Sequence, residues 1–122
     1  MPGPLESTTF DFAVRIIHLY KHLTKEHHEF VLAKQLLRSG TAIGALVREA
    51  QQAESRPDFI HKLSIALKEA QETEYWLLLL KKTNYLTPKE AQSILADLKE
   101  VLKLLTSIIK TTKKTPSRKA SS

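Results

Sequence analysis

The segment LAKQLLRSGTAIGALVREAQQA, residues 32–53, carries the most regular pattern in the chain. Its apolar or small residues recur at alternating steps of four and three, which places them on one face of an α-helix. This row comprises Leu32, Leu36, Ser39, Ile43, Leu46, Ala50 and Ala53. A second row beside it comprises Leu37, Gly40, Gly44 and Val47. The segment therefore predicts a helix with two packing faces, one for the chain's own core and one, thinned by glycine, for a close neighbour.

Two helices are expected in the first half of the chain. The first covers residues 9–25, with Ser7 or Thr8 as the capping residue. The second covers residues 30–55 and contains the two-faced segment. Pro57 ends the second helix, because a proline ring disfavours the helical conformation of the residue before it.

Two more helices are expected in the second half. Asp58 is a first-turn acid or cap of the third, whose apolar row continues to Leu80. The sequence TPKE at residues 87–90 combines a capping threonine, a proline at the first helical position and a reciprocal glutamate, which is a capping box. Short connections favour antiparallel neighbours, so the prediction is an all-α, antiparallel up-down-up-down four-helix bundle over residues 9–112.

Composition narrows the class of protein. With 122 residues, the chain has the length of one domain. It has no cysteine, which excludes a disulfide framework, a thiolate nucleophile and a Cys-ligated metal. The start has no cationic or apolar signal segment, and the unbroken apolar run at residues 76–80 is far shorter than the roughly 20 residues of a membrane span. We therefore expect a cytoplasmic protein.

The formal charge of +6 is concentrated near the end of the chain. Five basic residues and no acidic residue follow residue 109, which leaves 14 bases and 13 acids before it. Residues 113–122 are polar and lysine-rich, so we expect a disordered basic tail, and we expect residues 1–8 to be disordered as well.

Self-association is the interpretation we favour for the second apolar rows. The predicted fourth helix has a second apolar row at Leu95, Leu102 and Ile109. The predicted second helix has a second row that includes Gly40 and Gly44. The residues predicted to lie at a subunit interface are Gly40, Gly44, Val47, Leu95 and Leu102. The alternative is that these rows complete a thick monomeric core.

Three stretches resemble a known family. The sequences QLLRSGTAIGALVREA at 35–50, DFIHKLSIALKEAQETEYWL at 58–77 and LLTSIIKTT at 104–112 are similar to those of a bacterial family of four-helix bundles. The family is named for proteins encoded in intervening sequences of large-subunit ribosomal RNA genes. The resemblance implies a homopentameric ring of bundles with no known catalytic activity. A more distant resemblance, to the accessory variability protein of diversity-generating retroelements, implies contact with a reverse transcriptase and nucleic acid.

Basic residues at helical spacing are the candidate nucleic-acid contacts, because a phosphate backbone is bound by such stripes without base reading. The candidates are Arg15, Lys34, Arg38, Arg48, Lys113 and Lys114. The alternative is an ordinary solvated face.

Metal and catalytic motifs are weak. His18 and His22 are four residues apart, as helix-borne metal ligands are, but no further ligand motif accompanies them, so no metal and no cofactor are expected. Glu49 and Glu72 fit ion pairs between helices better than acid–base catalysis. No nucleophile motif or phosphate loop occurs.

The prediction is a non-enzymatic, homo-oligomeric accessory protein that binds RNA or DNA or a nucleic-acid-processing protein. The alternative is a homo-oligomeric protein-interaction scaffold with no nucleic-acid role. A third hypothesis, a metal-dependent bundle enzyme, would require bound metal.

Overall fold

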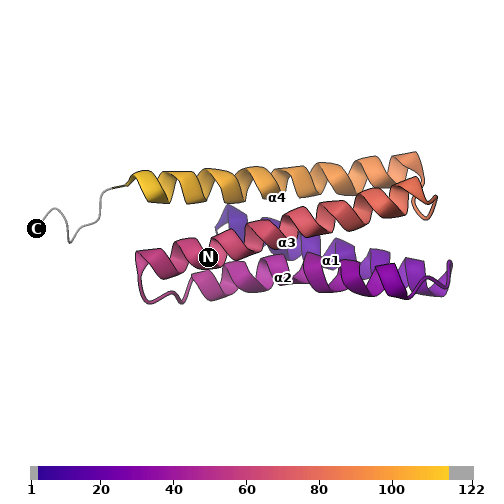
Figure 1. Cartoon of the computed structure of the whole chain (residues 1–122), viewed down its shortest axis with the longest axis horizontal. Helices are drawn as coiled ribbons and strands as arrows, with labels where there is room; N and C mark the ends of the chain where they lie inside the picture. Colours follow the sequence, from indigo (N-terminus) through magenta and orange to yellow (C-terminus); the bar gives the residue numbers. More distant parts are fainter. Residues whose placement is uncertain (1–2, 116–122) are drawn as a thin grey trace, which may run out of the picture.

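The computed structural model describes residues 3–115, and they form four helices. These are α1 (Pro4–Lys25), α2 (Val31–Ala50), α3 (Arg56–Lys82) and α4 (Pro88–Lys114). Successive helices run antiparallel and side by side, and α1 also packs against α4, which closes the bundle (Figure 1). The prediction of an all-α, up-down-up-down four-helix bundle is confirmed.

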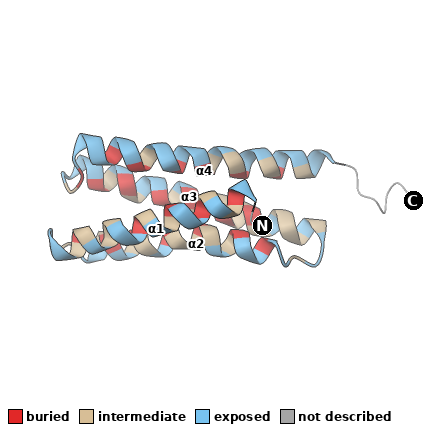
Figure 2. Cartoon of the chain, turned by 180° about the vertical axis from the view of Figure 1, so that it is seen from behind, coloured by how far each residue is buried: buried red, intermediate tan, exposed pale blue. Residues whose placement is uncertain are grey.

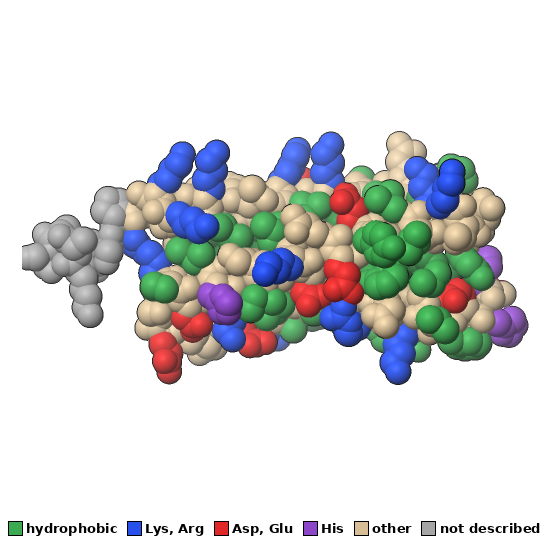
Figure 3. Space-filling view, viewed as in Figure 1, with side chains coloured by type: hydrophobic (Ala, Val, Ile, Leu, Met, Phe, Trp, Pro, Cys, Tyr) green, Lys and Arg blue, Asp and Glu red, His purple; other side chains and the backbone are tan. Residues whose placement is uncertain are grey.

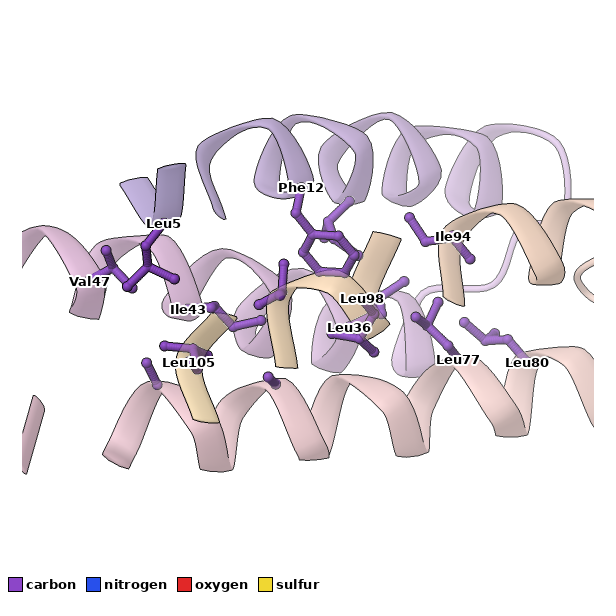
Figure 4. Packing of buried hydrophobic residues seen from close by; sticks show 14 of the residues in the cluster. Leu5, Phe12, Leu36, Ile43, Val47, Leu77, Leu80, Ile94, Leu98 and Leu105 are labelled. Carbon is purple, nitrogen blue, oxygen red and sulfur yellow. The ribbon is translucent and has the colours of Figure 1, made fainter. Parts of the chain in front are cut away.

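The core is a continuous stripe along the inner faces of all four helices, and exposed residues lie on the outer faces (Figure 2). Its largest fully buried side chains are Phe12, Ile16, Leu23, Leu36, Ile43, Val47, Leu63, Leu77, Leu80, Leu98, Val101 and Leu105. Leu5 and Val47 lie together towards one end of this cluster, and Leu77 and Leu80 towards the other (Figure 4). The core thus extends over the length of the bundle.

One buried contact between α2 and α3 is polar. The hydroxyl oxygens of Ser39 and Thr73 lie 2.9 Å apart, and both residues are fully buried. The Thr73 hydroxyl also lies 2.7 Å from the backbone carbonyl oxygen of Glu69. These hydrogen bonds satisfy polar groups that would otherwise be costly in an apolar interior.

The start of α1 differs from our expectation of disorder over residues 1–8. Residues 1 and 2 lie outside the described part, but the helix already begins at Pro4, with Gly3 as its N-cap. A proline suits the first helical position, where its missing N–H is not needed. The extra turn also buries Leu5, which is 6% exposed, in the core. Neither Ser7 nor Thr8 is the cap.

The connection between α2 and α3 also differs. Our prediction extended α2 to Ser55, but α2 ends at Ala50, and the backbone N–H groups of residues 51–53 then bond three residues back in a tighter turn. Ser55 is extended and belongs to the next helix, because its side chain accepts a hydrogen bond from the Asp58 N–H. Pro57 therefore lies in the first turn of α3.

The start of α4 is as predicted. Thr87 and Glu90 form both hydrogen bonds of the capping box. The end of α4 lies beyond our predicted boundary, because the helix includes Lys113 and Lys114. Residues 116–122, the remainder of the predicted basic tail, lie outside the described residues.

Candidate nucleic-acid interface and subunit surfaces

Arg38 lies in an ion-pair cluster between α2 and α3. Its guanidinium contacts the carboxylates of Glu69, at 3.3 Å, and Glu72. The indole N–H of Trp76 donates a second hydrogen bond to Glu72 Oε2 at 2.9 Å. The hydrogen bond from Arg38, and then that from Trp76, lower the pKa of Glu72 below its ordinary range. The charge of Arg38 is thus balanced within the chain, and Glu72 serves to join the helices.

Arg15 is also paired within the chain. Its Nη1 lies 2.6 Å from Asp97 Oδ2 and donates to the Ser93 carbonyl, while its Nη2 donates to Ser93 Oγ. These contacts join α1 to α4 across the side where the two helices meet. Arg15 therefore has little free charge to offer a phosphate.

Lys34 and Arg48 are exposed and make no ion pair among residues 3–115. Arg48 of α2 lines a groove between α1 and α2, and Phe10 of α1 lines it too. Lys34 lies on the outer face of α2, one turn before Arg38. The structure does not bring the four predicted arginines and lysines of α1 and α2 into one continuous stripe.

The outer face of α4 does carry a continuous basic row, which we call the lysine edge. It consists of Lys99, Lys103, Lys110, Lys113 and Lys114. The steps from 99 to 103, 110 and 114 are four, seven and four residues, so these side chains share the face opposite the buried row of α4. All five residues are exposed, and none forms an ion pair within the described part of the chain. Figure 3 shows basic side chains standing along this edge.

Our sequence analysis named only Lys113 and Lys114 of the lysine edge, and it placed them in a disordered tail. Both lie in the last turn of α4. Lys99, Lys103 and Lys110 were missed, although their helical spacing was legible in the sequence. They were overlooked because we considered the net charge of residues 1–109, which is close to zero, and not the distribution of that charge over the helix faces.

Three of the predicted interface residues contribute to packing inside the chain. Gly40 is buried against α1, and a Cβ there would lie 2.8 Å from Ile16 Cγ1. A Cβ on Gly44 would lie 3.3 Å from the Thr9 carbonyl oxygen. Val47 is fully buried in the core. The glycines thus permit close approach of α1 and α2 within one chain. Gly40 and Val47 are buried in this packing, whereas Gly44 also lines an open groove and stays a predicted interface residue.

The other two predicted interface residues, Leu95 and Leu102, are half-buried and pack against the core from α4. The largest exposed apolar side chains lie elsewhere, on α1 and near the facing ends of α2 and α3. They are Phe10, Val14, Ile17, Phe30, Val31, Tyr75 and Leu78. None of them is among the five residues predicted to lie at a subunit interface.

Glu49 and the pair His18 and His22 lie at separate places in the described part of the chain. Glu49 pairs with Lys62 at 3.3 Å. His18 and His22 lie in a shallow cleft between α1 and α4 beside Arg15 and Lys89. Residues 3–115 contain no group of three His, Cys, Asp or Glu side chains placed to hold a metal ion.

None of the four helices of the described chain is both long and apolar enough to cross a membrane. Fold and surface together define the class as a helical bundle with a basic edge and exposed apolar surfaces. The model of the family of 23S rRNA-intervening sequence proteins matches residues 6–107. The chain therefore belongs to this family.

A solved crystal structure supports the same family assignment. The chain is similar to a crystal structure from Bacteroides thetaiotaomicron, described as a protein of unknown function from the S23 ribosomal protein family. Identity is 59%, the TM-score is 0.86, and the match covers 87% of this chain and 98% of the other. No curated protein matched. Neither the family nor the neighbour indicates an enzyme.

Proposed function

We propose that this protein is a non-enzymatic, homo-oligomeric accessory protein that binds structured RNA, or a ribonucleoprotein, through the lysine edge of α4. The observation that carries the proposal is the row of five exposed lysines with no acidic partner among the described residues. The family name, which links these proteins to 23S rRNA genes, supports RNA as the nucleic acid. The cytoplasm is the matching location.

The geometry of the lysine edge suits a phosphate backbone. Helical positions 99 to 114 span about 22 Å at about 1.5 Å per residue. Side chains at steps of four lie about 6 Å apart along the helix axis, close to the separation of successive phosphates on an extended strand. Each phosphate neutralised by a lysine releases condensed counterions, which favours binding without base reading. The expected interaction is therefore salt-sensitive and weakly sequence-specific.

Self-association would multiply this edge. The resemblance noted above implies a homopentamer, in which five edges act on one RNA. Linked weak sites bind far more tightly than one site, provided that the ligand can reach them together.

Fluorescence anisotropy with a labelled ribosomal RNA fragment, at salt concentrations between about 50 and 200 mM, tests the proposal. The test variant carries Lys99→Gln, Lys103→Gln and Lys110→Gln. The control carries Lys21→Gln, Lys25→Gln and Lys81→Gln, which remove the same charge from α1 and α3. Since each phosphate contact contributes about 0.7–0.9 to the slope of log K against log salt, the test variant should lose about 2–3 from the slope. Equal losses in both variants, or no binding by the wild type, would overturn the proposal.

The second candidate is a protein-interaction scaffold without nucleic-acid binding. The exposed apolar side chains of α1 and α3 favour it, because contiguous apolar surface on a small protein marks contact with other proteins. Partner capture that survives nuclease treatment, from a protein whose lysine-edge variant captures equally well, would support the scaffold.

A further inference from the structure

The exposed apolar side chains gather on two separate surfaces. One, the groove face, consists of Phe10, Val14 and Ile17 on α1 and the groove beside them. The steps of four and three place these residues on the outermost face of α1. The other, the end patch, consists of Phe30 and Val31 at the start of α2 and Tyr75 and Leu78 near the end of α3.

The two surfaces point in different directions. The pairs Arg38–Glu72 and Ser39–Thr73 set the antiparallel register that brings the start of α2 level with the end of α3. Apolar side chains cover that end of α3 in Figure 3, on the face turned to the viewer. Helix α1 lies behind in Figure 1 and in front in Figure 2. The groove face and the end patch therefore lie on opposite sides of the bundle.

The shapes of the surfaces are complementary. The groove has a volume of about 560 Å³, and its lining includes the small residues Ala13, Gly44 and Ala45. The end patch instead presents bulky side chains, with Tyr75 56% and Leu78 47% exposed. Small lining residues leave room for such side chains to approach the backbone closely.

Charges around the two surfaces are complementary as well. Glu6, Asp11 and Arg48 line the groove. Lys34 and Lys82 flank the end patch, each one turn from an apolar member, and Glu74 lies next to Tyr75. Within residues 3–115 none of these charged groups has an ion-pair partner. Contact between the surfaces would place Glu6 and Asp11 of one copy near the two lysines of the other. It would also place Arg48 near the Glu74 carboxylate.

We propose that the occupant of the groove is a second copy of this chain, which inserts its Tyr75–Leu78 end patch between α1 and α2 of the first. This inference rests on the self-association proposed above and names the surfaces that produce it. Because the two surfaces differ and face apart, the contact is head-to-tail, and the open assembly keeps one unused groove at one end and one unused end patch at the other until a ring closes. Two-fold pairing, by contrast, would join identical surfaces.

Site-directed cross-linking tests the contact, since the chain contains no cysteine. One variant carries Ala45→Cys in the groove and a second carries Tyr75→Cys in the end patch. The two variants are mixed, allowed to exchange subunits and then oxidised. We expect a disulfide-linked dimer in this mixture and none in either variant alone. The control mixture replaces Tyr75→Cys with Thr106→Cys on the lysine edge and should not cross-link. Cross-linking of Tyr75→Cys to itself alone would overturn the head-to-tail contact.

Sedimentation supplies the second measurement. Phe10→Asp and Leu78→Asp each place a charge at an exposed position, so each variant should fold and sediment as a monomer. Their mixture should form a dimer and nothing larger, because only one intact contact remains between them. An oligomer unaffected by both substitutions would overturn this inference and leave self-association standing. A monomeric wild type at micromolar concentration would overturn self-association itself.

Discussion

At the scale of the residue, Gly40 shows how a missing side chain decides which two helices meet. Ile16 occupies the space where a Cβ on Gly40 would lie, with Cγ1 at 2.8 Å and Cγ2 at 2.9 Å. Both residues are buried, so neither can turn towards solvent. The small residue thus allows α1 to approach α2 within one chain.

Gly40→Ala should destabilise the protein by about 1–3 kcal/mol, the typical cost of an added methyl group in a packed core. The gain of about 1 kcal/mol in helix propensity offsets only part of this. The matched background is Ile16→Ala, which removes the opposing atoms, and there Gly40→Ala should stabilise. Chemical denaturation of the four proteins measures both effects. The same sign in both backgrounds would contradict the role assigned to this contact.

At the scale of the element, helix ends show what the sequence could and could not reveal. The start of α4 was predictable, because Thr87 and Glu90 satisfy each other's backbone groups through purely local contacts. The start of α1 was not, because it has no side-chain cap and depends on burial of Leu5 by other helices. Likewise, glycine spacing predicted close packing but could not reveal whether the neighbour was α1 or another subunit.

The capping box makes a pH-dependent contribution to stability. The hydrogen bond from the Thr87 N–H lowers the pKa of Glu90, and the nearby imidazoles of His22 and His27 lower it further. A carboxylate whose pKa is lowered by folding stabilises the protein above its unfolded pKa, and this is lost as the pH falls through the folded pKa. The stability advantage of wild type over Glu90→Gln should therefore be present at pH 7 and shrink below about pH 4.3, the unfolded value for glutamate.

Thr87→Ala removes the other half of the box and should cost about 1 kcal/mol at pH 7. Urea denaturation across the pH range measures both variants, with Ser93→Ala as a control on the same helix outside the box. An advantage over Glu90→Gln that grows as the pH falls would show that the charged hydrogen bond contributes nothing.

At the scale of the whole molecule, the lysine edge that we propose to bind RNA lowers the stability of the unbound bundle. Lys99 and Lys103, and again Lys110 and Lys114, are like charges four residues apart, which destabilise a helix by about 0.2–0.5 kcal/mol per pair. The charges that would bind RNA therefore lower the free energy of unfolding of the unbound bundle. The sequence contained this row, but only the position of the core stripe showed that all five lysines face outward.

Lys110→Glu should raise the free energy of unfolding at low salt by about 0.5 kcal/mol, because repulsion from Lys114 becomes attraction. The same substitution should weaken RNA binding, and Lys110→Gln should give about half of each effect. Thermal unfolding at low and high salt checks the first part, since screening should remove the gain. A gain that persists at high salt would point to a cause other than charge.

The hydroxyl pair of Ser39 and Thr73 has a consequence for folding fidelity. Aliphatic side chains alone would tolerate α2 sliding along α3 by one turn, since leucine meets leucine in either alignment. Such a slip would break the Ser39–Thr73 hydrogen bond in a dry interior, at about 1–3 kcal/mol for the one lost partner, while the Thr73 hydroxyl keeps the Glu69 carbonyl of its own helix. The two hydroxyl groups thereby favour one register of α2 against α3 over others that bury similar apolar surface. Every surface formed jointly by α2 and α3 depends on that register.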